Sequence, residues 1–341
     1  MKICIGYKLS QGPWGGGNRF VSNLITTLKS NGHQIVHKLY DKDIDLILIL
    51  DPRWRHENTT FNSGAVIRYL TFRNKNSIVV HRINECDQRK NTNYINSKIK
   101  MVNYCADHSV LVGSWMKDLK LTYSTDLKDI SVIKNGADTN IFNNQGHKQW
   151  DKKTPIRLVT HHWSNHFMKG FDIYSQIDKM LDQIKWRRKF EFTYIGNLPK
   201  NYSFKNVKYI KPLNDEALAN ELKRHHGYLT ASINEPGGNH QNEGALCGLP
   251  LIYRKSGCLP EYCNGFGISF EKEPLDQVII KFIENYDLLY EKISEYPNTA
   301  KVTSLKYEKL FINLISKREH IVKKRNLFKS PWHYLRNQLP L

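Results

Sequence analysis

The clearest chemical signal in the chain is the segment NEPGGNHQNEGALCGLP at residues 234–250, in which seven residues separate Glu235 from Glu243. We expect Glu235 to follow a strand at residues 228–232 and Glu243 to open a short helix, so that two carboxylates flank a glycine-rich turn at the carboxyl edge of a sheet. A carboxylate accepts hydrogen bonds from two neighbouring hydroxyls, which suits a sugar or a ribose. The alternative for two glutamates is helix capping and solvation.

Backbone amides at helix starts offer anion sites beside these carboxylates. The amides around Gly238, Asn239 and His240 stand where the expected helix begins, and helix N-terminal N–H groups attract phosphate. A second glycine-rich turn, GPWGGGNRF at residues 12–20, follows the first expected strand and leads into a helix. It contains no G-x-G-x-x-G fingerprint and no G-K-[ST], so a dinucleotide fold of that type and P-loop chemistry are disfavoured. The alternative is a plain strand–helix turn.

A third turn, HHWSNHFMKGFD at residues 161–172, carries a cation. Lys169 before Gly170 can supply positive charge to a diphosphate, although a single lysine is usually just a solvated side chain. The three histidines of this segment resemble metal ligands at first sight, but no matching set of carboxylates accompanies them, so we predict no metal site. The six cysteines form no C-x2-C pair, which favours free thiols in a reduced compartment.

Strand patterns alternate with helical patterns on both sides of one polar stretch. The expected strands before it lie at residues 2–7, 34–39, 46–50, 78–83, 109–112 and 130–133, and those after it at 156–160, 190–195, 207–210, 228–232 and 249–253. The polar stretch, NNQGHKQWDKKTP at residues 143–155, has the composition of a linker.

This alternation predicts an α/β protein with two doubly wound, parallel-sheet domains that face each other across a cleft. We place a first domain at residues 1–148, a second domain at 149–310 and a basic, aromatic helical tail at 311–341. Open sheets of this type bind ligands at the carboxyl ends of their strands, so the expected site is the cleft.

The chain is strongly basic, with 51 Lys and Arg against 32 Asp and Glu and a formal charge of +19. Nucleic acid, an anionic membrane surface, an acidic small molecule or simply a lysine-rich solvated surface would each fit this charge. No apolar run approaches the about 20 residues of a membrane-spanning helix. The N-terminus lacks the apolar region of a signal peptide, so we expect a cytoplasmic protein, with peripheral membrane attachment as an alternative.

The tail at residues 317–341 holds seven Lys or Arg against one Glu, with Phe328, Trp332 and Tyr334 between them. Basic and aromatic residues together suit a membrane interface. The other interpretation is a surface helix that packs back on the first domain with Trp and Phe on its buried side.

The motifs, in their order along the chain, resemble the retaining GT-B glycosyltransferases of family four, also called glycosyltransferases group 1, from Lys2 to about Ile315. SVIKNGADTNIF at residues 131–142 is similar to the family signature that ends the first domain. Glu235 and Glu243 match its E-x7-E motif, and the residues that follow, GALCGLPLIYRKSGCLPE, resemble the stretch after that motif.

The resemblance implies that residues 1–148 form the acceptor-side domain and that residues 149–310 form the nucleotide-sugar-binding domain. It also implies roles for individual residues. Glu243 would hold the ribose hydroxyls, and Glu235 would contact the donor sugar near the reacting centre. The implied donor-binding set is Gly16, Gly17, Asn18, Ser164, Lys169, Gly238, Asn239, His240 and Glu243. Lys169 and the glycine amides would stabilise the charge that the departing nucleoside diphosphate gains, so no metal and no cofactor beyond the donor is implied.

Two departures from the family pattern leave alternatives open. The usual Arg five residues before the Lys is Ser164 here, so Ser164, His162 or Arg254 would hold the phosphate. The family often has a His after a first-domain strand, and HRINECD at residues 81–87 offers His81 and Asn84 as catalytic candidates beside Glu235.

The resulting hypothesis is transfer of a sugar, with retention, from a nucleoside diphosphate sugar to a hydroxyl of a glycan, a lipid-linked acceptor or a polysaccharide. One alternative is a basic protein that binds nucleic acid or a membrane surface on an α/β scaffold. It would leave both glutamates without a use, and because they would repel nucleic acid we expect none as a partner. Another alternative is a GT-B nucleotide-sugar epimerase, which would form product without an acceptor.

Overall fold

The computed structural model describes residues 1–10, 16–53, 57–124 and 126–339. The chain divides into two compact units. The first unit comprises Met1–Lys134 and Lys301–Leu341, and the second comprises Asn135–Ala300.

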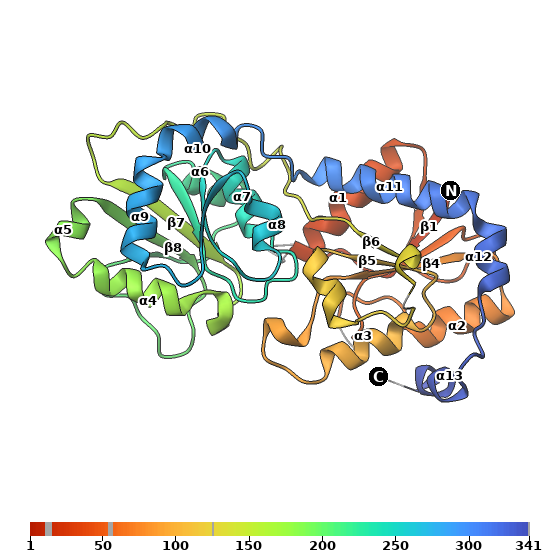
Figure 1. Ribbon diagram of the computed structural model, residues 1–341. Coiled ribbons are helices and arrows are strands. Elements are labelled where there is room, and N and C mark those ends of the chain that lie inside the picture. The colour runs from red at the N-terminus through yellow and green to blue at the C-terminus, as the bar shows by residue number, and fades with distance from the viewer. Residues whose placement is uncertain (11–15, 54–56, 125, 340–341) are drawn as a thin grey trace. The chain divides into compact units, whose positions relative to one another are not determined.

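The first unit alternates strands and helices, and the last three helices of the chain join it (Figure 1). Its elements are β1 Lys2–Ile5, α1 Gly16–Ser30, β2 Gln34–Val36, β3 Leu46–Ile49, α2 Ser63–Phe72, β4 Ile78–Ile83, η1 Asp87–Arg89, α3 Ile95–Asn103, β5 His108–Leu111, η2 Ser114–Leu119, η3 Leu127–Asp129, β6 Ile130–Val132, α11 Ala300–Ser316, α12 Arg318–Lys324 and α13 Pro331–Gln338.

The second unit repeats the alternation. Its elements are β7 Ile156–His162, η4 Phe167–Lys169, α4 Phe171–Met180, α5 Ile184–Arg187, β8 Phe190–Gly196, β9 Lys208–Ile210, α6 Asp215–Leu222, β10 Gly227–Thr230, α7 His240–Leu246, β11 Leu251–Arg254, α8 Leu259–Cys263, β12 Gly267–Phe270, α9 Leu275–Glu284 and α10 Tyr286–Ile293.

Within the described residues, each unit contains one six-stranded sheet whose strands pair in parallel. The strand orders are β2-β1-β3-β4-β5-β6 and β12-β11-β10-β7-β8-β9. In both sheets the chain first adds strands on one side of the first strand, β1 or β7, and then crosses over to add the remaining strands on its other side. The order therefore reverses between β1 and β3 in the first unit and between β7 and β10 in the second.

Successive side chains along a strand point to opposite faces of the sheet, and helices cover both faces of the first sheet. In β1, Ile3 and Ile5 pack with α1 and α11, whereas Cys4 between them packs with α2. The rings of Phe20 in α1 and Tyr307 in α11 meet edge to face at 5.2 Å between centroids. These contacts confirm two doubly wound sheets and confirm that the C-terminal helices pack on the first unit.

The boundaries of the units differ from the expected ones at residues 148 and 310. The first unit ends at Lys134 because the Asn135 amide donates to the Tyr262 hydroxyl (2.6 Å) and its side chain donates to the Gly237 carbonyl (2.6 Å). Gly136 passes so close to Thr299 that a Cβ atom would lie 2.2 Å from the Thr299 carbonyl carbon. The Asn-Gly pair therefore belongs to the second unit.

The polar stretch at residues 143–155 is part of the second unit rather than a separating linker. His147 Nε2 bonds the His225 carbonyl at 2.9 Å, and the Trp150 ring meets the Tyr286 ring edge to face. The polar composition correctly predicted that many of these residues are exposed. It did not predict the contacts of His147 and Trp150 with the rest of the second unit.

All six cysteines are free and buried. No helix among the described residues combines the length and the apolar character needed to cross a membrane.

Candidate functional site

The second unit gathers the sequence-predicted residues at the carboxyl ends of β7 and β10, where the strand order reverses. Parallel sheets bind ligands at such a point because the loops that leave the two strands diverge to opposite faces and open a crevice. His161 and His162 end β7, Lys169 ends the short helix η4 that follows, and Glu235 lies five residues beyond the end of β10 at Thr230.

Lys169 and Glu235 form a buried ion pair between the Lys169 ammonium and a Glu235 carboxylate oxygen. Lys169 is 8% exposed and Glu235 is 4% exposed. The Ile233 amide donates to the Met168 carbonyl (2.8 Å), which fastens the loop after β10 to η4 and brings the two charges together. Burying two charges is costly unless each compensates the other, so the Lys169 ammonium and the Glu235 carboxylate depend on one another to remain buried.

The backbone around Glu235 is held by an unusual turn. Asn234 has a φ of +52°, a left-handed conformation that asparagine tolerates better than most side chains. Gly257 has a φ of +56°, and a Cβ atom there would lie 2.5 Å from both the backbone nitrogen and the backbone oxygen of Glu235. The Cys258 amide donates to that same oxygen (2.8 Å). Gly257 is therefore required for the loop at residues 254–258 to approach Glu235.

Glu243 and His161 form the second contact between ionisable side chains. Glu243 Oε2 lies 2.7 Å from His161 Nε2, and the Tyr228 hydroxyl lies 3.1 Å from His161 Nδ1. Glu243 is 5% exposed and sits in the first turn of α7, as expected. Tyr228 in β10 thus orients His161, and His161 orients Glu243.

Two further histidines are buried beside these pairs. His162 Nε2 lies 2.7 Å from the Tyr174 hydroxyl, and His240 Nε2 lies 2.8 Å from Thr230 Oγ1. Their rings meet at 4.7 Å between centroids. Burial lowers the pKa of His162 well below its ordinary value and lowers the pKa of His240 to about 3, so both rings are neutral near pH 7.

The remaining predicted residues of this unit surround the two pairs. Gly238 is buried, and a Cβ atom there would lie 2.6 Å from His240 Cε1. Asn239 is half-buried at the start of α7, and Ser164 is half-buried in the loop between β7 and η4. Arg254, an alternative phosphate ligand, donates to Asp172 at 2.5 Å.

The first unit places its predicted residues along the carboxyl edge of its own sheet. Residues 11–15 of the glycine-rich turn lie outside the described residues. Gly16 and Gly17 begin α1, and Asn18 exchanges two hydrogen bonds with the Ser10 backbone, at 3.0 and 3.1 Å.

The two catalytic candidates of this unit differ in access. His81 lies within β4 and is 0% exposed; its Nδ1 is 3.2 Å from the Asn103 side-chain nitrogen. Burial lowers the pKa of His81 to about 3. Asn84 follows the last residue of β4 and is half-buried. Asn84 is therefore the better placed of the two to reach a ligand.

Sequence reasoning missed the role of His161, which it considered only as a metal ligand. The signal was present, because His161 is one of two consecutive histidines at the end of an apolar strand. Among the described residues, no group of three or more His, Cys, Asp or Glu side chains is close enough to hold a metal ion.

A separate hollow of about 510 Å³ lies at the opposite edge of the second sheet. Its lining includes Arg157, Glu191 and Lys208, which stand at the amino ends of β7, β8 and β9. It lies at the edge where parallel sheets do not place their ligands.

Comparison with known proteins was informative only at the level of structure. No protein-family model and no curated protein matches the chain. The catalytic domain of starch synthase IV from Arabidopsis thaliana, bound to ADP and acarbose, matches with a TM-score of 0.65 and 13% identity over 92% of this chain and 99% of that one.

Two more solved structures match over similar lengths. Sucrose-phosphate synthase from Thermosynechococcus elongatus has a TM-score of 0.61 and 12% identity, covering 92% of this chain and 99% of that one. HepE from Anabaena, in complex with UDP and glucose, has a TM-score of 0.61 and 13% identity, covering 91% and 98%. The chain has the GT-B fold, as its resemblance to family-four glycosyltransferases implied.

Proposed function

We propose that the chain is a retaining glycosyltransferase that moves a sugar from a nucleoside diphosphate sugar to an acceptor hydroxyl. The observation that carries the proposal is the meeting of the Lys169–Glu235 and His161–Glu243 pairs at the reversal point of the second sheet. The printed ligands of two structures with this fold, ADP with acarbose and UDP with glucose, support a nucleotide-sugar donor.

Glu243 is the proposed ribose ligand. A carboxylate accepts through two oxygens, so Glu243 can keep its contact with His161 while it accepts from the ribose hydroxyls. His161 and Tyr228 hold the carboxylate in one orientation, which reduces the entropy that the donor must otherwise overcome to order it.

Lys169 is the proposed partner of the leaving diphosphate. An ammonium carries three N–H donors, so it can contact Glu235 and phosphate oxygens together. The leaving group gains charge in the transition state, and a preoriented cation stabilises that charge more than it stabilises the ground state. The proposal assigns no role to a metal ion, and transfer in the presence of EDTA is expected.

Glu235 is proposed to contact the donor sugar near the anomeric carbon, with Asn84 as a candidate from the first unit. Gly16, Gly17, Asn18, Ser164, Gly238, Asn239 and His240 remain predicted donor-binding residues. The predicted stereochemical outcome is retention, which the anomeric NMR signals of the first product formed would report.

Calorimetry with UDP, ADP and GDP tests the donor site. We expect at least one of these nucleotides to bind, and Glu243→Ala to weaken it by about 1–3 kcal/mol, or roughly 5- to 150-fold, because the ribose hydroxyls lose a charged acceptor. Glu191→Ala at the opposite edge of the same sheet is the matched control and should leave affinity unchanged. Failure of all three nucleotides to bind, or equal affinity in Glu243→Ala, would contradict the proposal.

A further inference from the structure

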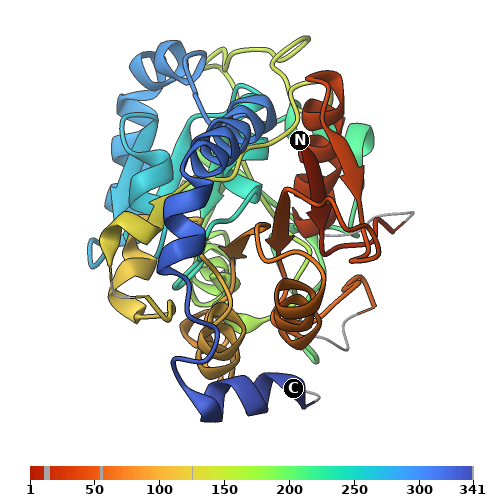
Figure 2. The ribbon, with the colours of Figure 1, turned by 90° about the vertical axis from the view of Figure 1, so that its right-hand side faces the viewer.

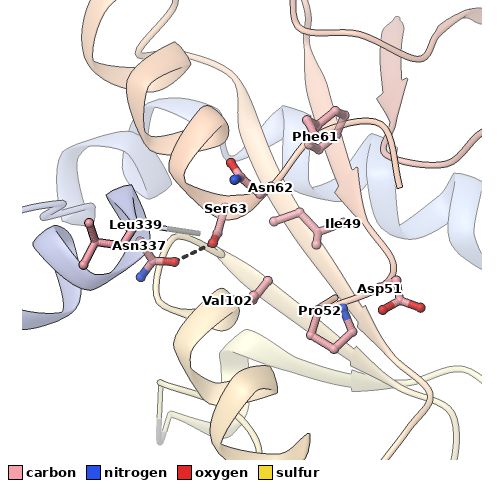
Figure 3. A pocket seen from close by; sticks show the side chains of 9 residues that line it. All are labelled: Ile49, Asp51, Pro52, Phe61, Asn62, Ser63, Val102, Asn337 and Leu339. Atoms are coloured by element: carbon pink, nitrogen blue, oxygen red, sulfur yellow. Dashed lines mark hydrogen bonds between the residues drawn. The ribbon is translucent and has the colours of Figure 1, made fainter. Parts of the chain in front are cut away.

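The C-terminal helix α13 is held on the first unit by hydrogen bonds of Asn337 and by Tyr334, which packs against the buried residues of α2 and α3. The Ser63 hydroxyl of α2 donates to the Asn337 side-chain oxygen at 2.5 Å, as Figure 3 shows, and Asn337 donates to the Met101 carbonyl at 3.2 Å. Gly64 leaves room for this approach, since a Cβ atom there would lie 2.2 Å from the Asn337 carbonyl oxygen. The His333 ring stacks on Tyr104 at 5.6 Å.

The seam between α13 and the body is closed. The crevice drawn in Figure 3, lined by residues such as Asp51, Ser63 and Leu339, has a volume of about 10 Å³. That is at the lower limit for one water molecule. Upstream, the buried Arg325–Asp107 ion pair fixes the segment that leads into α13. The helix is therefore docked in one orientation rather than resting loosely on the surface.

This orientation leaves two large apolar side chains of α13 exposed. Trp332 and Leu335 are 68% and 60% exposed, and their spacing of three residues places them on one side of the helix. Leu339, which follows the end of the helix and lines the crevice, is 56% exposed. The expectation that the Trp and Phe of the tail face the body is wrong for Trp332 and Phe328, because Asn337 and Tyr334 make the contacts to α2 and α3 instead.

The apolar surface continues onto α2. Phe72 and Tyr40, which are among the most exposed aromatic side chains described, line a shallow groove of about 360 Å³ together with Arg68 and Arg73. Arg68 donates to the Gln338 side chain at 2.6 Å, so the groove adjoins the end of α13. Figures 1 and 2 both show α13 lying beneath α2 and α3.

The helices of this face carry only one sign of charge. Helices α2, α3 and α13 contain Arg68, Lys98, Lys100 and Arg336 and no Asp or Glu. Residues 320–341 add four more cations and likewise no Asp or Glu. Exposed tryptophan and leucine on helices that carry only basic charges have the character of an interfacial membrane anchor.

We propose that the α2–α13 face, made of α2, α3, α13 and Tyr40, binds the surface of an anionic lipid bilayer. Apolar side chains such as Trp332 and Leu335 would enter the headgroup region while the arginines and lysines contact lipid phosphates. A second copy of this chain is the poorer occupant, since a charge of +19 on each copy opposes self-association through a basic face. A nucleic acid would use the cations but not the exposed leucines.

Vesicle co-sedimentation of the full chain tests the proposal. We expect binding to vesicles of phosphatidylglycerol and phosphatidylcholine, weaker binding at higher salt, and little binding to phosphatidylcholine alone. Trp332→Ser with Leu335→Ser should lower the partition coefficient by at least about tenfold, since two large apolar side chains no longer leave water. The matched control, Ile184→Ser with Leu288→Ser, removes two exposed apolar side chains of the second unit and should bind as the native protein does.

Circular dichroism melting should show that both double variants stay folded, and Phe72→Ser alone provides an independent test at the other end of the face. Equal vesicle binding by the native protein and the Trp332/Leu335 variant would overturn the proposal. Binding to duplex DNA without binding to anionic vesicles would also overturn it. Nucleotide binding in calorimetry should be unchanged in these variants, so the result is distinguishable from failure of the donor site.

Discussion

The two units share one topology but treat the carboxyl edge of the sheet differently. In the second unit, Lys169 with Glu235 and His161 with Glu243 form contacts between side chains of different elements, all of them buried. In the first unit, the described candidates at that edge are neutral, with Asn18 bonded to the backbone and Asn84 half-buried.

Folding alone does not explain this difference. The first sheet also has ion pairs after β3 and β4, Asp51–Arg53 and Glu85–Arg89, but these are more exposed than the pairs of the second unit. Buried ion pairs are often no more stabilising than apolar packing. The deeper burial of the pairs in the second unit is what we expect if they bind the donor, as proposed. The comparison therefore supports the proposal that the donor is bound mainly by the second unit.

The largest expected effect comes from breaking one of the buried pairs. Glu235→Ala leaves the Lys169 ammonium buried without its carboxylate and should reduce the free energy of unfolding by about 3–5 kcal/mol. Asn84→Ala in the first unit should cost less than about 1 kcal/mol, because a half-buried amide can be replaced by water. Urea unfolding of both variants measures the difference, and similar losses would remove the contrast between the units.

A smaller effect is expected at the glycines. Gly257→Ala forces a Cβ atom onto the Glu235 backbone and also requires a left-handed alanine, so we expect a loss of about 2–4 kcal/mol. Gly32 of the first unit has a φ of +81°, but a Cβ atom there would have no described neighbour within 4 Å. Gly32→Ala should therefore cost only about 1 kcal/mol. Equal thermal-midpoint shifts in the two variants would show that close approach to Glu235 is unimportant.

Acid sensitivity should also be greater in the second unit. Among the described residues, the histidines with a lowered pKa are His81 and His108 in the first unit and His147, His162, His225, His226 and His240 in the second. Because the pKa of these histidines is lowered in the folded chain, the unfolded chain takes up protons below about pH 6.5 while the folded chain does not. The free energy of unfolding therefore decreases as the pH is lowered.

His240→Gln isolates one of these groups. The pKa of His240 is lowered to about 3 by burial, so between pH 7 and pH 5 its protonation in the unfolded chain should account for about 2 kcal/mol of lost stability. Urea unfolding at the two pH values should show a loss smaller by that amount in His240→Gln. A loss equal to that of the native protein would show that His240 is not held neutral by the fold.

The sequence predicted which site residues lie close together wherever their positions follow from the ends of strands. Lys169 and Glu235 each follow an apolar strand, and the carboxyl ends of neighbouring parallel strands meet at one edge, so their proximity could be predicted. The contact of His161 with Glu243 could not, because alternation along a strand does not say which partner a terminal side chain meets.

Periodicity was misleading at the tail for a related reason. It assumes that the most apolar residues of a helix face the core, whereas α13 docks through Tyr334 and through the hydrogen bonds of Asn337 and leaves Trp332 exposed. In the same way, polar composition at residues 143–155 indicated a linker, although His147 and Trp150 anchor that stretch to the second unit.

The most direct test of the central assignment is hydrogen–deuterium exchange of the full chain with and without whichever nucleoside diphosphate binds. Slower exchange is predicted in the segments that carry the two pairs, residues 161–170 and 234–243, because bound ligand suppresses local opening. Slower exchange confined to the opposite edge of that sheet, at residues 146–157 and 221–225, would contradict the assignment and place the nucleotide in the other hollow.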